Sequence, residues 1–183
     1  TGITCVKSAP SLNLLVATSA GKQWGVFHDT SMKKLFVVHQ DEVVTAFEIL
    51  GASKDKQEEE HRLGMKYTPA QLFNLDKDTL LTVVLAMPSG VVVYTVCVEE
   101  CRGVKTFELL HNQQMYITDL SNLKSPDQHS VNYSQVRSGQ HGRTGYQLVG
   151  VTDDGIVLVW DTSVLRFESE AKYREHYAHV PRR

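Results

Sequence analysis

Eight histidines are the residues of this chain with the clearest capacity to bind a metal. His176 and His179 are three residues apart and could share one face of a helix, and His129 and His141 lie in one polar stretch. No cysteine or carboxylate joins either pair at the spacing that zinc sites use. The histidines therefore predict no metal site, and we expect no cofactor.

The three cysteines offer a second kind of chemistry. Cys97 and Cys101 are four residues apart across the end of one expected strand, where we interpret them as packing residues. Together with Cys5 they make an odd, sparse set, which fits a reducing compartment better than a disulfide framework. We therefore expect an intracellular protein, either cytoplasmic or nuclear.

Catalytic motifs are missing from the sequence. No glycine-rich phosphate cradle precedes a helix, and neither G-x-S-x-G nor H-E-x-x-H occurs. The acidic residues cluster in expected loops and turns, where solvation is their usual role. We expect no enzymatic activity; a hydrolase-type or metal-dependent enzyme is a competing class, which a cluster of acids with a histidine would favour.

Composition sets further bounds. A chain of 183 residues, 42% hydrophobic and 22% charged, can bury the core of an ordinary globular domain. The net charge of −2 gives no general attraction to nucleic acid or anionic membranes, although a stripe formed by Lys33, Lys34, Arg102 and Lys105 would favour RNA. The longest apolar runs have the length of strands, well short of the roughly 20 residues of a membrane-spanning helix. The first residues do not resemble a signal peptide, and the missing initiator Met suggests a fragment.

The strongest structural signal is residues 146–161. Two apolar segments flank the turn Asp153-Asp154-Gly155, a pattern that predicts a β-hairpin. Similar segments predict three units of four strands each along the chain. The expected strands are 2–9, 12–18, 24–28, 34–39, then 42–50, 79–87, 91–98, 104–110, then 115–120, 146–152, 156–160 and 164–167.

The hairpin closes on Trp160-Asp161 after a DDG turn, and in this it resembles the WD-repeat (WD40-like) β-propeller family. The resemblance implies an all-β fold of three consecutive four-stranded propeller blades, at 1–39, 40–111 and 112–167, with a C-terminal tail at 168–183. Residues 168–179 of this tail could form a short helix. Because propellers usually have about 4 to 8 blades, these three imply a larger propeller with its remaining blades in the same or another chain. Open ends would leave partly apolar faces, an aggregation hazard unless they are covered.

The resemblance also implies a structural hydrogen-bond network. In the family, a histidine between blades joins a hydroxyl, a turn carboxylate and the tryptophan. The matching residues here are His111, Thr152, Asp154 and Trp160.

Two long insertions, 51–78 and 121–145, separate the first and second strands of the second and third units. In a propeller such loops leave on one face of the disc, and long loops in compact domains are usually functional or disordered. We expect the chain to be a non-catalytic scaffold that mediates protein–protein interactions within a multi-subunit assembly. An RNA-contacting subunit of a ribonucleoprotein or ribosome-biogenesis complex is the alternative. The candidate protein-binding residues are Lys54, Lys56, Arg62, Tyr67, Tyr133, Arg137 and Arg143.

Overall fold

The structure, a computed structural model, describes residues 2–53, 79–111, 114–124 and 146–181. In these residues the chain is mostly β, with three antiparallel sheets that follow one another along the sequence. The all-β expectation is confirmed at this level. The first sheet contains β1 (Ile3–Ala9), β2 (Leu14–Ser19), β3 (Gln23–His28) and β4 (Lys34–His39), with a 3-10 turn η1 (Pro10–Leu12) after β1. The second contains β5 (Ala46–Ser53), β6 (Leu80–Met87), β7 (Gly90–Cys97) and β8 (Arg102–Leu110). The third contains β9 (Ile117–Lys124), β10 (Tyr146–Thr152) and β11 (Val157–Asp161), and helix α4 (Thr162–His176) follows.

The expected twelfth strand, 164–167, is wrong, because these residues lie inside α4. The third sheet therefore has three strands in the described residues, and the helix begins six residues before the expected tail. The buried side chains of α4 include Arg166, Ser169, Glu170 and Tyr173, spaced as one helix face. Three of these four residues are polar, so the apolar residues of this segment do not repeat at the helical period and do not predict a helix.

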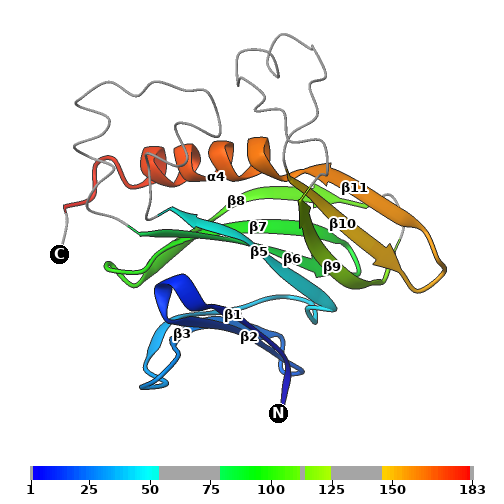
Figure 1. The fold of residues 1–183 in the computed structure, drawn as a ribbon, viewed down its shortest axis with the longest axis horizontal. Helices are drawn as coiled ribbons and strands as arrows, with labels where there is room; N and C mark the ends of the chain where they lie inside the picture. The colour runs from blue at the N-terminus through cyan, green and yellow to red at the C-terminus, as the bar shows by residue number, and fades with distance from the viewer. Residues whose placement is uncertain (1, 54–78, 112–113, 125–145, 182–183) are drawn as a thin grey trace, which may run out of the picture.

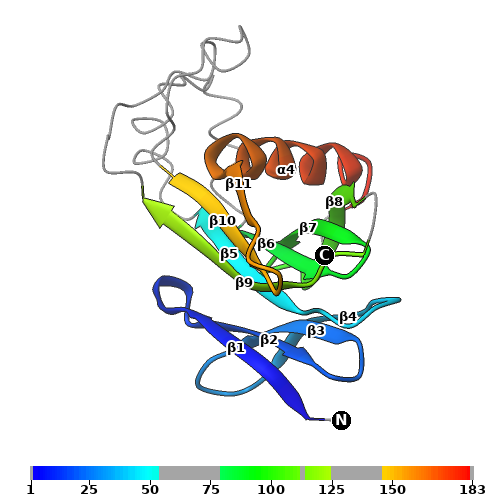
Figure 2. The same ribbon diagram turned by 90° about the vertical axis from the view of Figure 1, so that its right-hand side faces the viewer.

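The three sheets stack face to face with the second sheet in the middle (Figures 1 and 2). Every residue of β6 and β7 is buried, because both faces of this sheet are covered. The first strand of each sheet contacts the first strand of the next, β1 with β5 and β5 with β9. The sheets are thus ordered in space as they are in sequence.

Two hydrophobic clusters fill the spaces between the sheets. Alternate residues of β6 point to opposite sides: Leu81, Val83 and Leu85 join the first sheet's cluster. Val84 and Ala86 join the cluster beneath the third sheet. Because successive side chains of a strand point to opposite faces and both faces are buried here, nearly every residue of β6 is apolar.

Helix α4 packs on the second sheet, chiefly against its strands β7 and β8 (Figure 1). Four buried hydroxyls connect it to the sheet. Thr82 and Thr95 share a hydrogen bond at 3.2 Å, Thr95 and Ser169 share one at 2.9 Å, and Thr106 bonds Ser169 as well. Ser169 thus connects the helix to a row of hydrogen-bonded hydroxyls on the sheet.

A glycine makes room for the beginning of the helix. Gly51 has a φ of +145°, at an irregularity in the pairing of β5 with β6. A Cβ atom there would lie 2.7 Å from a guanidinium nitrogen of Arg166, which itself pairs with Glu170 at 3.3 Å. The lack of a side chain at Gly51 allows Arg166 to pack flat on the strand.

Tyr173 buries the end of α4 against Leu80 and Cys97. Burial raises the pKa of its phenol, and the nearby Cys97 adds to this shift. The neutral phenol is thus favoured in the folded chain. Its contribution to stability is complete below the usual tyrosine pKa of about 10 and is lost as the pH rises further toward the folded value.

We therefore expect the free energy of unfolding to fall above pH 10, and to fall less steeply in Tyr173→Phe. Urea titrations between pH 8 and 11 measure both slopes. Tyr116→Phe is the matched control, since Tyr116 is 45% exposed. Equal slopes for Tyr173→Phe and the wild type would contradict this expectation.

Candidate protein-interaction surface

The expected binding loops are attached at one end of the sheet stack. The Asn122 side-chain amide donates to the Leu50 carbonyl at 3.4 Å, which brings the ends of β9 and β5 together. The expected starts of the insertions, at residues 51 and 121, are wrong, because β5 continues to Ser53 and β9 to Lys124. Residues 54–79 and 125–145 separate these strands from the next ones. The seven candidate binding residues lie within 54–78 and 125–145, outside the described residues: Lys54, Lys56, Arg62, Tyr67, Tyr133, Arg137 and Arg143.

The expected hydrogen-bond network is brought together only in part. The Thr152 hydroxyl donates to the Asp154 carboxylate and accepts from the Ile156 N–H at 2.8 Å, so these residues brace their own turn. His111 donates its backbone N–H to Ser89 at 2.8 Å. Its buried Nε2 has no partner among the described residues.

Trp160, the fourth member, is half-buried in the cluster between the second and third sheets. In the part of the chain that the structure describes, no hydrogen bond joins Trp160 or His111 to Thr152 or Asp154. Asp154 itself is exposed. The side-chain hydrogen bonds of the DDG turn are therefore local to the hairpin, while the Asp153 N–H donates to the Tyr116 carbonyl at 3.0 Å, just before β9.

This difference predicts unequal effects within the turn. Thr152→Val is expected to lower the free energy of unfolding by about 1–2 kcal/mol, because a buried hydroxyl with several partners is lost. Asp154→Ala is expected to lower it by only about 0.5 kcal/mol, as for other exposed positions. Urea titration of both variants measures the difference. A larger loss for Asp154→Ala than for Thr152→Val would place the important interaction at the carboxylate instead.

A single lysine connects all three sheets. Lys7 on β1 donates to the Glu48 carboxylate of β5 at 2.9 Å and to the Leu120 carbonyl of β9 at 3.0 Å. The side chains of Lys7 and Glu48 are 29% and 17% exposed. The ion pair is thus partly shielded from water, on the first strands of the three sheets.

Replacing Lys7 by methionine is expected to cost about 1–2 kcal/mol. The remaining Glu48 charge and the Leu120 carbonyl lose a partner, but partial exposure limits the penalty. Lys33→Met is the matched control, because Lys33 is exposed and its side chain makes no hydrogen bond or ion pair with the described residues. Thermal unfolding at low and high salt measures both. Equal melting temperatures for the two variants would show that the bridge adds no stability.

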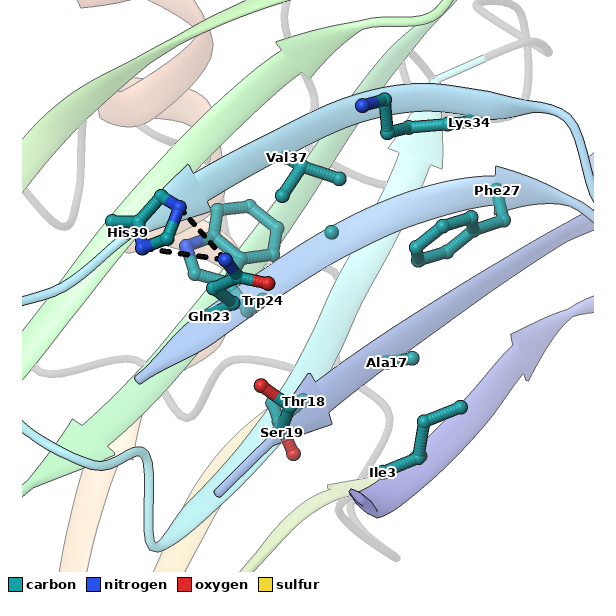
Figure 3. Close-up of a pocket in the computed structure, with 11 residues that line it drawn as sticks. Ile3, Ala17, Thr18, Ser19, Gln23, Trp24, Phe27, Lys34, Val37 and His39 are labelled. Carbon is teal, nitrogen blue, oxygen red and sulfur yellow. Dashed lines mark hydrogen bonds between the residues drawn. The ribbon is translucent and has the colours of Figure 1, made fainter. Parts of the chain in front are cut away.

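The outer face of the first sheet is hollowed into a trough of about 420 Å³ (Figure 3). Ala17 and Gly25 are paired in register at its floor, and Val37 pairs with Gly25 from β4. A Cβ atom at Gly25 would lie 2.6 Å from a Val37 methyl group. The trough is therefore open because the residues at its floor are small. Ile3 and Phe27 complete the apolar lining.

One end of this trough is polar. The Gln23 side-chain amide donates to the His39 ring, with Nε2 atoms 2.7 Å apart (Figure 3). The Ser19 hydroxyl is buried there without a partner among the described residues. The trough is therefore apolar along its floor and polar at one end.

The other chemical candidates give weak signals. In the described residues no three histidines, cysteines or carboxylates gather as a metal site would need. Two of the four cations of the expected basic stripe are paired with acids, Arg102 with Glu100 and Lys105 with Glu108. No helix in the described part of the chain is both long and apolar enough to cross a membrane. The thiols of Cys5, Cys97 and Cys101 are reduced, and the Cys97 thiol donates to the Glu99 carboxylate at 3.6 Å.

Comparison with known proteins gives no further guide. The models of known protein families do not match this chain, and no curated protein matches it either. Lys7, Glu48 and the trough escaped the sequence analysis because each depends on which residues face each other across neighbouring sheets or strands.

Proposed function

We propose that this chain is a non-catalytic scaffold built from WD-repeat-like propeller blades, which mediates protein–protein interactions within a multi-subunit assembly inside the cell. One observation carries the proposal. The three sheets stack in chain order, and their first strands are in contact, β1 with β5 and β5 with β9. Radial repetition of four-stranded sheets around first strands is the arrangement of propeller blades.

The same arrangement supports a rigid platform. The central strands of the second sheet, β6 and β7, are buried on both faces and hydrogen-bonded on both sides, so their side chains are closely packed. The ends of β5 and β9 meet at one end of the stack through Asn122 and Leu50. We propose that the two insertions, attached at these strand ends, hold the partner proteins, since recognition is usually carried by loops on a rigid scaffold.

Trimming the insertions tests this function. Residues 54–78 and 125–145 are each replaced by a short Gly-Ser linker, and the matched controls carry the same residues in scrambled order. The trimmed chains are expected to keep the β signal in circular dichroism and to lose protein partners in a quantitative pull-down. The scrambled controls are expected to lose them too, because the same side chains no longer stand in the order that a specific partner recognises.

Two results would contradict the scaffold. One is recovery of the same partners at undiminished yield by the doubly trimmed chain. The other is a reproducible enzymatic turnover that a single point mutation abolishes.

A further inference from the structure

The outer face of the third sheet carries a ridge of exposed apolar side chains, which Asp119, Ser121 and Gln147 border on the same face. Val157 is 60% exposed, Val159 is 56% exposed and Leu123 is 52% exposed. Val151 pairs with Val157, and Val149 pairs with Val159, so the valines of β10 and β11 are direct cross-strand neighbours. They form one continuous patch on the side of the sheet that faces away from the core.

This ridge has the chemistry of a buried sheet face. The second sheet turns Val84, Val91 and Val93 toward the third sheet, where all three are buried. The third sheet turns its valines in the same direction along the stack. The ridge therefore occupies the position against which a fourth sheet would pack.

The opposite end of the stack carries a surface that could receive the ridge. The trough on the first sheet has a floor of small residues, Ala17 and Gly25, flanked by Phe27 and Val37. A ridge of valines can fit into such a floor as side chains do between neighbouring sheets.

Charges at one side of the two surfaces are complementary as well. Lys22 lies in the turn between the second and third strands of the first sheet, and it is exposed. Asp153 and Asp154 lie in the corresponding turn of the third sheet, and both are exposed. Opposite charges at matching turns favour a contact of the ridge with the trough over a contact of two like faces.

We propose that the ridge of one chain packs into the trough of a second copy, and that the second copy returns the same contact, so that two chains close a ring of six sheets. This inference rests on the proposed propeller architecture. Six sheets fall within the roughly 4 to 8 blades at which propellers close, whereas three do not. A head-to-tail contact that closes after two copies satisfies both exposed faces and leaves none to form filaments.

Sedimentation velocity and light scattering of the intact 183-residue chain test the stoichiometry. The expected mass at micromolar concentration is twice the 20.6 kDa of one chain. Val159→Lys on the ridge and Ala17→Arg in the trough are each expected to halve that mass. The matched control is Leu110→Lys, since Leu110 is 70% exposed and lies on β8, outside both surfaces; it is expected to stay dimeric. Circular dichroism checks that each variant is folded, and Val157→Lys is a second ridge variant.

Mixing the variants distinguishes a head-to-tail ring from other dimers. The Val159→Lys chain keeps a normal trough, and the Ala17→Arg chain keeps a normal ridge. A one-to-one mixture is therefore expected to regain a dimer through one contact, with weaker affinity than the wild type.

A monomeric wild type overturns the inference, and so does an open series of larger species. A dimer that only one of the two surfaces affects shows a contact between like faces and also overturns it. A monomer that still recovers partners in the pull-down leaves the scaffold function standing. A dimer that recovers none contradicts the scaffold function alone.

Discussion

Replacement of Trp24 by alanine is expected to lower the free energy of unfolding by about 3–5 kcal/mol, the usual cost of removing a large aromatic side chain from a core. Trp24 is 1% exposed and lies between the first and second sheets. Its ring meets Phe36 edge-on at 5.6 Å and Tyr94 at 5.1 Å, measured between ring centroids. Truncation would leave a cavity at the contact of two sheets, which a rigid β stack cannot easily close.

Urea titration followed by circular dichroism measures this loss. The other tryptophan, Trp160, remains in the variant and gives a separate fluorescence signal for the third sheet. Tyr116→Ala is the control, since this aromatic side chain is 45% exposed and is expected to cost less than about 1 kcal/mol. A similar small loss for Trp24→Ala would mean that the first sheet does not pack on the second as described.

Ser169→Ala is expected to cost about 1–3 kcal/mol, a large effect for the removal of one oxygen atom. Ser169 is fully buried, and its hydroxyl bonds both Thr95 and Thr106. Thr106 keeps its bond to the Val93 carbonyl at 3.1 Å, but the row of hydrogen-bonded hydroxyls loses its connection to the helix. Buried hydroxyls that lose a partner bear a desolvation penalty that no water can relieve.

The expected signature of Ser169→Ala is local as well as global. Amide hydrogen exchange should accelerate in α4 first, because the helix loses its buried hydroxyl bonds to β7 and β8 and keeps the bond of Lys172 to the Thr106 carbonyl, while the sheets keep their cores. Glu175→Ala on the exposed side of α4 is the matched control and is expected to leave exchange unchanged. If both variants behave like the wild type, the helix is held by its apolar contacts alone.

Most of the strand architecture could be predicted from the sequence by itself. Segments such as 34–39, 146–152 and 91–98 match β4, β10 and β7 to within one residue at either end. Local information suffices here, because apolar residues at a period of two and turn residues between them act over a few positions. The positions of the two insertions, between the first and second strands of their sheets, followed from the same reading.

The tertiary structure alone decided the rest. Val164 and Leu165 suggested a strand, but the segment is a helix. Its buried Ser169 bonds Thr95 of the second sheet, and its buried Arg166 pairs with Glu170 one helical turn away. Lys7 reads as an ordinary surface lysine until β5 and β9 bring Glu48 and Leu120 to it. Such polar contacts depend on which strands become neighbours and in what register. The energy of a buried polar group is set by the partner it meets across the fold, and a single local sequence does not contain that partner.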